Sequence, residues 1–148
     1  MPDNFAMIVR RIDAWAGDQR APRFSDPDIK PIVERMRDIF PAPLPGSVER
    51  LVAIILRRGR AFGEGHIHYN FDQVMYFPAA NADGMSIGGS KRGDRVIGGV
   101  ARTTNRGDMR YIGRGEYYSI PANRSGADLR ILSLQRVIPG AHDNSDYL

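Results

Sequence analysis

Residues 1–45 carry two apolar patterns with helical spacing. The first runs over Phe5, Ile8, Val9, Ile12 and Trp15. The second runs over Ile29, Ile32, Val33, Met36, Ile39 and Phe40. Because an α-helix turns once in about 3.6 residues, each set lies on one face, and each predicts an amphipathic helix. The stretch Ser25-Asp26-Pro27-Asp28 has the composition of a capping box, so we expect the second helix to begin there.

Three alternate prolines, Pro41, Pro43 and Pro45, end this helical region. Proline lacks a backbone donor and restricts its own backbone, so the three make a short, stiff connector. At 148 residues the chain fits one domain. Within that domain we expect a helical N-terminal arm over residues 1–45, packed on a second part that spans residues 46–148 and ends in a polar tail.

From Glu49 onward, short apolar or alternating runs are separated by glycines and polar clusters. The predicted strands cover residues 51–56, 62–69, 73–77, 84–88, 95–104, 109–113, 116–121 and 128–137. Many short strands with no helical pattern between them predict an antiparallel sandwich or barrel. Leu51 to Leu56 is apolar at consecutive positions, which predicts burial of both faces of the strand. One face would meet the core, and the other the helices or a second subunit.

Charge and composition narrow the function classes. The formal net charge is +4 and the pI is about 9.8, but the basic residues are spread along the chain and no recognition motif accompanies them. We therefore expect no nucleic-acid partner. No apolar run reaches the length of a membrane span, which predicts a soluble protein. The N-terminus does not resemble a secretory signal and there is no cysteine, so we expect a cytoplasmic location.

The segment His66-Ile67-His68 holds two of the three histidines in the chain and lies in a predicted strand. Residues two apart in a strand point to the same face about 6.5–7 Å apart, so both imidazoles can reach one ion. Neutral imidazole is a common ligand of transition metals. An accompanying carboxylate or amide would come from Asp72 or Gln73. These residues make a metal site the first hypothesis.

Two stretches of the chain resemble the motifs of the cupin superfamily. Gly59 to Gly84 is similar to the first motif, with a glycine, His-x-His, an acid three or four residues later, an apolar strand and another glycine. Gly115 to Asn123 is similar to the second motif, with five residues between Gly115 and Pro121. The resemblance covers roughly residues 49–137. It implies a mainly β fold, a cupin-type antiparallel jelly-roll barrel, to which this chain adds an N-terminal two-helix arm.

The chain departs from the cupin pattern at two ligand positions. Where the family usually has glutamate, Asp72 stands at the shorter spacing and Gln73 at the longer one, and Gln73 matches the register better. Gly126 replaces the histidine of the second motif. The resemblance then implies a divalent transition metal, iron, manganese, nickel or zinc, held by His66, His68 and Gln73. Without a fourth protein ligand, water or substrate would have to complete the coordination shell.

Four other residues are candidates for proton transfer or for substrate binding. Glu64 shares a strand face with the histidines, but strand rise places it roughly 13 Å from His68 along the backbone, too far for joint ligation. Glu64 and Tyr118 are therefore the candidates for proton transfer. Arg57 and Tyr76 are the candidates for binding the substrate, with the arginine suited to an anionic group.

The predicted function is that of a metal-dependent cupin enzyme acting on a small organic substrate by Lewis-acid and proton-transfer chemistry, as a lyase, cyclase or isomerase. One alternative is an iron-dependent cupin dioxygenase. Another is a metal-free cupin that binds a small molecule or uses His66 or His68 as a general base. A homodimer is expected from the resemblance and from the strand that is apolar on both faces. His142 lies in the polar tail, which either folds over the barrel mouth or takes no part.

Overall fold

The computed structural model describes residues 4–15, 24–42, 44–57, 66–79, 82–92, 95–119, 128–139 and 146–147. Within these ranges, helices α1 (Phe5–Trp15) and α2 (Lys30–Ile39) come first. The strands that follow are β1 (Val48–Leu56), β2 (His66–Ile67), β3 (Phe71–Ala79), β4 (Ala82–Ile87), β5 (Ser90–Arg92), β6 (Arg95–Ile97), β7 (Val100–Thr104), β8 (Met109–Ile112), β9 (Tyr117–Ser119), β10 (Leu129–Val137) and β11 (Asp146–Tyr147).

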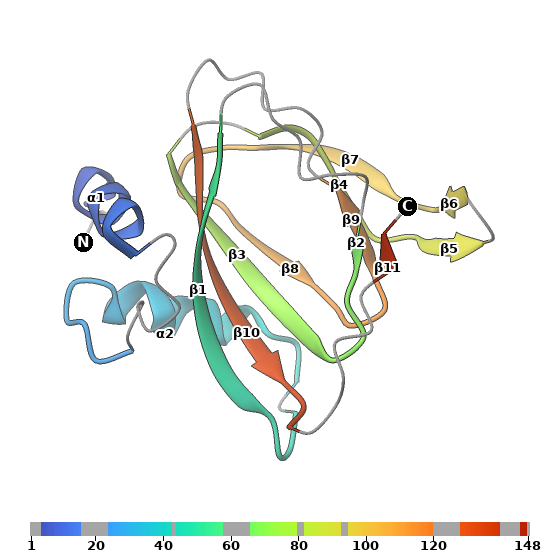
Figure 1. Ribbon diagram of the computed structural model, residues 1–148, viewed down its shortest axis with the longest axis horizontal. Helices are drawn as coiled ribbons and strands as arrows, with labels where there is room; N and C mark the ends of the chain where they lie inside the picture. Colours follow the sequence, from blue (N-terminus) through green and yellow to red (C-terminus); the bar gives the residue numbers. More distant parts are fainter. Residues whose placement is uncertain are drawn as a thin grey trace.

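The strands form two facing sheets (Figure 1). The first sheet has the order β1-β10-β3-β8, and the second has the order β11-β2-β9-β4-β7. All their pairings are antiparallel, and strands β5 and β6 form a separate hairpin. The two helices cover the face of the first sheet that is turned away from the second sheet (Figure 1). The mainly β, antiparallel architecture predicted from the sequence is therefore confirmed.

The helix-facing side of the first sheet is buried by both helices. The helices contribute Ile8, Ile12, Ile32, Val33 and Met36, and the strands contribute Leu51, Val74, Tyr76, Leu132 and Leu134. Ala53 and Ile55 pack against the same cluster. The second apolar face of strand β1 is thus covered by the helices, which was one of the two alternatives. Because the helices cover this face, it no longer supports the expectation of a homodimer.

The other side of the first sheet, here called the interior face, is turned toward the second sheet (Figure 1). A second apolar cluster lies there and consists of Leu56, Met75, Phe77, Ile112, Tyr118, Leu129 and Ile131. Side chains alternate along a strand, so the positions of Met75 and Phe77 assign Gln73 to the interior face and Asp72 to the helix-facing side. This alternation decides which polar groups can meet between the sheets.

Some predicted boundaries were wrong. Helix α2 begins at Lys30 rather than at residues 25–28, and Ile29 at its N-cap makes no side-chain capping bond. Asp26 instead accepts a hydrogen bond from the amide of Asp28 at 2.9 Å, because an aspartate side chain competes for nearby backbone donors in a turn. The predicted strand 95–104 is two strands, β6 and β7, separated at Gly98, which has a φ of 89°. Strands β5 and β11 were not predicted.

Candidate functional site

The two cupin-like motifs lie side by side in the second sheet. Strand β2 of the first motif pairs with strand β9 of the second, so that His66 is opposite Tyr118. The amide of Gly115 donates a hydrogen bond of 2.9 Å to the carbonyl of His68. Gly115 has a φ of 76°, a left-handed conformation that glycine adopts without steric cost. The turn that opens the second motif therefore positions the main chain of His68.

The side chain of His68 contacts both motifs. Its Nε2 lies 3.1 Å from the Tyr118 hydroxyl, within hydrogen-bond distance. Tyr118 is 3% exposed and belongs to the interior apolar cluster, whereas His68 is half-buried. The imidazole also stacks on Phe71 with ring centroids 4.3 Å apart. A titratable ring is thus held between an aromatic surface and a buried phenol, and its tautomer decides which partner donates the hydrogen bond.

A chain of polar side chains crosses the interior face of the first sheet. Arg50 Nε donates to Gln135 Oε1 at 2.7 Å, and Gln135 Nε2 donates to Ser133 Oγ at 3.3 Å. The Ser133 hydroxyl in turn donates to Gln73 Oε1 at 2.8 Å. The Arg50 guanidinium lies 5.3 Å from the centroid of the Phe71 ring. His68 stacks on that same ring, so Phe71 contacts both the polar chain and the histidine.

Asp72 belongs to a different cluster, on the helix-facing side. Its carboxylate accepts hydrogen bonds from Arg136 Nε at 3.0 Å and from Arg136 Nη2, and it accepts another from the Tyr111 hydroxyl at 3.0 Å. Burial, together with the hydrogen bond to Asp72, raises the pKa of Tyr111 to about 12. Of the two ligand candidates that the sequence left open, only Gln73 faces the interior.

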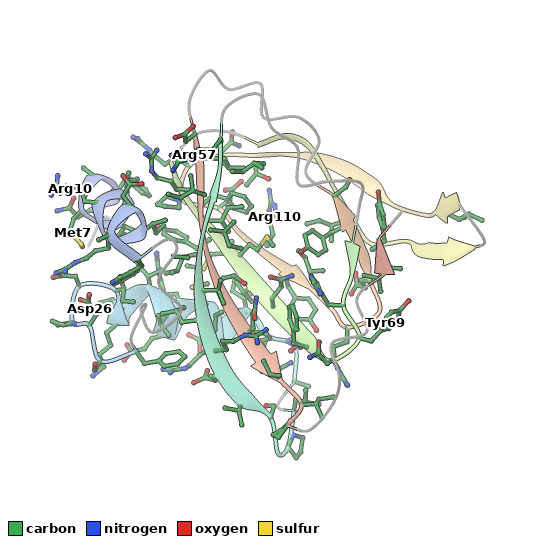
Figure 2. The ribbon with its side chains drawn as sticks, in the orientation of Figure 1. Met7, Arg10, Asp26, Arg57, Tyr69 and Arg110 are labelled. Carbon is green, nitrogen blue, oxygen red and sulfur yellow. The ribbon has the colours of Figure 1, made fainter. Side chains whose placement is uncertain are left out.

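The structure separates the other predicted site residues. Tyr76 is fully buried against the helices, so its position does not support the prediction that it binds substrate between the sheets. Arg57 follows the last residue of β1 (Figure 2), has a side chain that is 67% exposed, and pairs with Asp128 at 2.9 Å. Glu64 and His142 lie outside the described residues, and so does Gly126. For His66 only the backbone is described.

Three interior residues were missed by the sequence analysis: Arg50, Ser133 and Gln135. A signal for two of them was present. In strand β10, Ser133 and Gln135 are polar at alternate positions, which places both on one face. Both are buried, with exposed fractions of 0% and 6%. Buried polar side chains are costly unless they are hydrogen-bonded, so such a pair marks a polar network.

The predicted metal ligands are His66, His68 and Gln73, and the structure describes the side chains of the last two. In the part of the chain that the structure describes, no group of three histidine, cysteine, aspartate or glutamate residues is placed to hold a metal ion. The His68 Nε2 is bonded to Tyr118, and the Gln73 Oε1 is bonded to Ser133. An ion bound through His68 Nε2 would compete with the bond to Tyr118, whereas Gln73 Oε1 keeps a second lone pair beside its bond to Ser133.

Neither the scan against protein-family models nor the search of curated proteins gave a match. Among solved structures, vicilin from Solanum melongena matches with a TM-score of 0.54 and 16% identity, over 78% of this chain and 28% of that chain. The BH2720 protein from Bacillus halodurans matches with a TM-score of 0.50 and 13% identity, over 69% of this chain and 71% of that chain. A sugar phosphate isomerase from a cupin superfamily of Silicibacter pomeroyi has a TM-score of 0.47 and 16% identity, over 68% and 56% of the two chains.

The fold is a cupin-type antiparallel jelly roll, as the two sequence motifs predicted. At these identities the likeness concerns the fold alone. The chain spans about a quarter of the vicilin chain, at 28%. One fold carries many activities, so the function has to be argued from the residues between the sheets.

Proposed function

We propose that this protein is a cupin enzyme that transfers a proton on a small organic molecule bound between the two sheets, with His68 and Tyr118 as the acid-base pair. The observation that supports this most is the 3.1 Å contact between His68 Nε2 and the Tyr118 hydroxyl, which joins the two motifs. Imidazole ordinarily titrates near neutral pH, and it can take up and return a proton under physiological conditions. Lyase, cyclase and isomerase reactions all use such a step.

The pair can move a proton when Nε2 of His68 carries the lone pair. The phenol then donates its proton to Nε2 and takes the proton that leaves the substrate. One proton leaves the substrate, and the imidazole becomes imidazolium. The 3.1 Å hydrogen bond stays satisfied before and after the transfer.

The test is the exchange of carbon-bound protons with deuterium, followed by proton NMR in D2O. Protein purified without a metal-binding tag is incubated with a panel of small ketones and keto acids. We expect exchange with at least one member, lost in His68→Gln and reduced about 100-fold or more in Tyr118→Phe. Tyr69→Phe makes the same chemical change at an exposed tyrosine that points away from the sheets (Figure 2), and exchange should persist. Full exchange in Tyr118→Phe would overturn the proposal.

The second candidate is the metal-dependent enzyme predicted from the sequence, including its iron-dependent dioxygenase form. Two observations favour it: Gln73 lies on the interior face, and His68 stacks on Phe71 of the same strand. A divalent transition metal bound there would act as a Lewis acid. Elemental analysis of the tag-free protein beside His68→Ala decides between the two. About one equivalent of iron, manganese, nickel or zinc that is lost in the variant would support the metal centre.

The predicted homodimer and cytoplasmic location are carried forward as proposals. The homodimer now rests on the cupin resemblance alone, because the helices cover the strand face that had suggested it. Sedimentation of the purified chain tests it, and a monomer would remove it. In the described chain, neither helix is long and apolar enough to cross a membrane.

A further inference from the structure

The polar chain on the interior face has a fixed direction. A guanidinium has only donors, so Gln135 must turn its oxygen toward Arg50 and its Nε2 toward Ser133. Ser133 accepts that hydrogen bond with its oxygen, and its own hydroxyl hydrogen is directed to Gln73 Oε1. The arginine thereby sets the orientation of the Gln135 amide, and the Gln73 amide in the structure turns its oxygen toward Ser133.

The series of hydrogen-bonded side chains that begins at Arg50 ends at the amide Nε2 of Gln73. Gln73 is 2% exposed and lies on the interior face, and its oxygen is used by Ser133. Among the described residues, none accepts a hydrogen bond from this Nε2. The end of the chain therefore offers a hydrogen-bond donor, where a cupin glutamate would offer an acceptor.

The other end of this series of hydrogen-bonded side chains is the Arg50 guanidinium, which is a cation. Arg50, Gln135 and Gln73 form one row across strands β1, β10 and β3, and neighbouring strands are about 4.8 Å apart. No described acidic residue forms an ion pair with Arg50. By contrast, Arg110, which also points between the sheets (Figure 2), pairs with Asp108 at 3.1 Å. The row thus presents a positive charge and an amide donor about two strand spacings apart.

We propose that this row, the donor row of Arg50, Gln135, Ser133 and Gln73, binds a small organic carboxylate. The carboxylate is bound by the Arg50 guanidinium, and a second oxygen of the molecule accepts a hydrogen bond from Gln73 Nε2. Phe71 contacts both Arg50 and His68, so the Arg50 end of the row and the imidazole lie at one aromatic ring. This names the substrate class of the same site and rests on the proposed function. It replaces Arg57, which is paired with Asp128, as the group that recognises the anion.

The probes are acetate, succinate and benzoate, each compared with its neutral amide by NMR titration of the full chain. We expect at least one carboxylate to bind at least tenfold tighter than its amide, and we expect added salt to weaken it. If no carboxylate binds better than its amide, the proposal is overturned. This comparison needs no variant, so a variant that fails to fold does not affect it.

Two variants then locate the binding. Arg50→Met removes the charge but keeps an unbranched side chain, and Gln73→Glu replaces the amide donor with an acceptor. Each should weaken the carboxylate at least tenfold. Arg106→Met is the matched control, because this guanidinium also lies over a phenylalanine, 4.7 Å from the centroid of Phe5, on helix α1. Carboxylate binding unchanged in both Arg50→Met and Gln73→Glu would overturn the proposal.

A last variant separates this proposal from the proton-transfer proposal. Tyr118→Phe should keep the affinity for the carboxylate while losing deuterium exchange, because the phenol is not part of the donor row. If the carboxylates fail to bind but exchange still depends on Tyr118, only the substrate class is wrong. If they bind through the row but exchange does not depend on Tyr118, only the acid-base pair is wrong.

Discussion

Replacing Asp72 by asparagine tests whether this residue is structural rather than a ligand. Its side chain is almost fully buried and accepts hydrogen bonds from Arg136 and Tyr111. Arg136 also donates to the carbonyl of Ala42, and its guanidinium lies 4.1 Å from the centroid of the Phe40 ring. The carboxylate therefore connects the first sheet to the segment that follows helix α2. Asparagine keeps the shape but removes the charge.

The expected loss of stability follows from burial. Removing one partner of a buried ion pair costs about 3–5 kcal/mol. The side chain of Arg136 is 13% exposed and keeps its bond to Ala42, so partial hydration reduces the expected loss. We expect Asp72→Asn to lower the free energy of unfolding by about 2–4 kcal/mol. For a domain of this size that is a fall in Tm of roughly 5–12 °C.

Urea unfolding followed by circular dichroism measures the loss. Asp28→Asn is the matched control, because Asp28 pairs with Arg11 at the surface, where both side chains are more than 40% exposed. An exposed pair contributes little, so the control should change stability by about 0.5 kcal/mol or less. If Asp72→Asn is as stable as the control, the buried pair does not stabilise the fold. If instead it keeps its stability but loses carboxylate or metal binding, Asp72 is a ligand after all.

Three further predictions concern other parts of the structure. The pKa of Tyr111 rises from 10.0 to about 12 in the folded chain, so its contribution to stability is complete below pH 10 and is lost as the pH rises to about 12. Tyr111→Phe should lack this part of the loss of stability at alkaline pH. Free energies of unfolding that fall equally steeply with pH in the parent and the variant would contradict this prediction. Gly115→Ala should lower the free energy of unfolding in urea by about 1–2 kcal/mol and also slow deuterium exchange, because Gly115 positions His68. Gly46→Ala, at a similar φ of 78°, should lower the free energy of unfolding by the same amount and leave deuterium exchange unchanged. Ser133→Ala interrupts the donor row and leaves two buried amides without their partner, so it should destabilise the chain by about 1–3 kcal/mol and weaken carboxylate binding; a variant with unchanged stability would show that the row is not formed.

The sequence predicted the two sheets and the helical arm because their patterns are local. Strand β1 is apolar on both faces, and both faces are buried in the structure, against the helices and between the sheets. The motif spacing also singled out His68 and Tyr118, which the pairing of β2 with β9 brings into contact. Such predictions need only the side-chain periods of helices and strands and a short motif.

The side of the sheet on which Tyr76 lies could not be read from the sequence. Val74-Met75-Tyr76-Phe77 is apolar at consecutive positions, and all four side chains are fully buried. Alternation then shows that Tyr76 and Met75 point in opposite directions, but not which of them faces the interior. Only the packing of the helices on one side of the sheet decides this.

The donor row could not be predicted for a different reason. Arg50, Gln135 and Gln73 lie far apart in the sequence and meet only through the register of three strands. A shift of one residue in either pairing would turn a member of the row to the opposite face. A lone arginine before an apolar run has no local signal that separates it from Arg57 at the other end of the same strand.

The most direct test of the central claim is the rate of deuterium exchange in tag-free protein after treatment with a chelator. The account predicts that exchange persists at the rate of the untreated protein, and that it falls about 100-fold in Tyr118→Phe treated in the same way. The chemistry would then depend on the hydrogen bond between His68 and Tyr118. Exchange that disappears with the chelator and returns when iron, manganese, nickel or zinc is added would contradict the account and establish the metal-dependent enzyme.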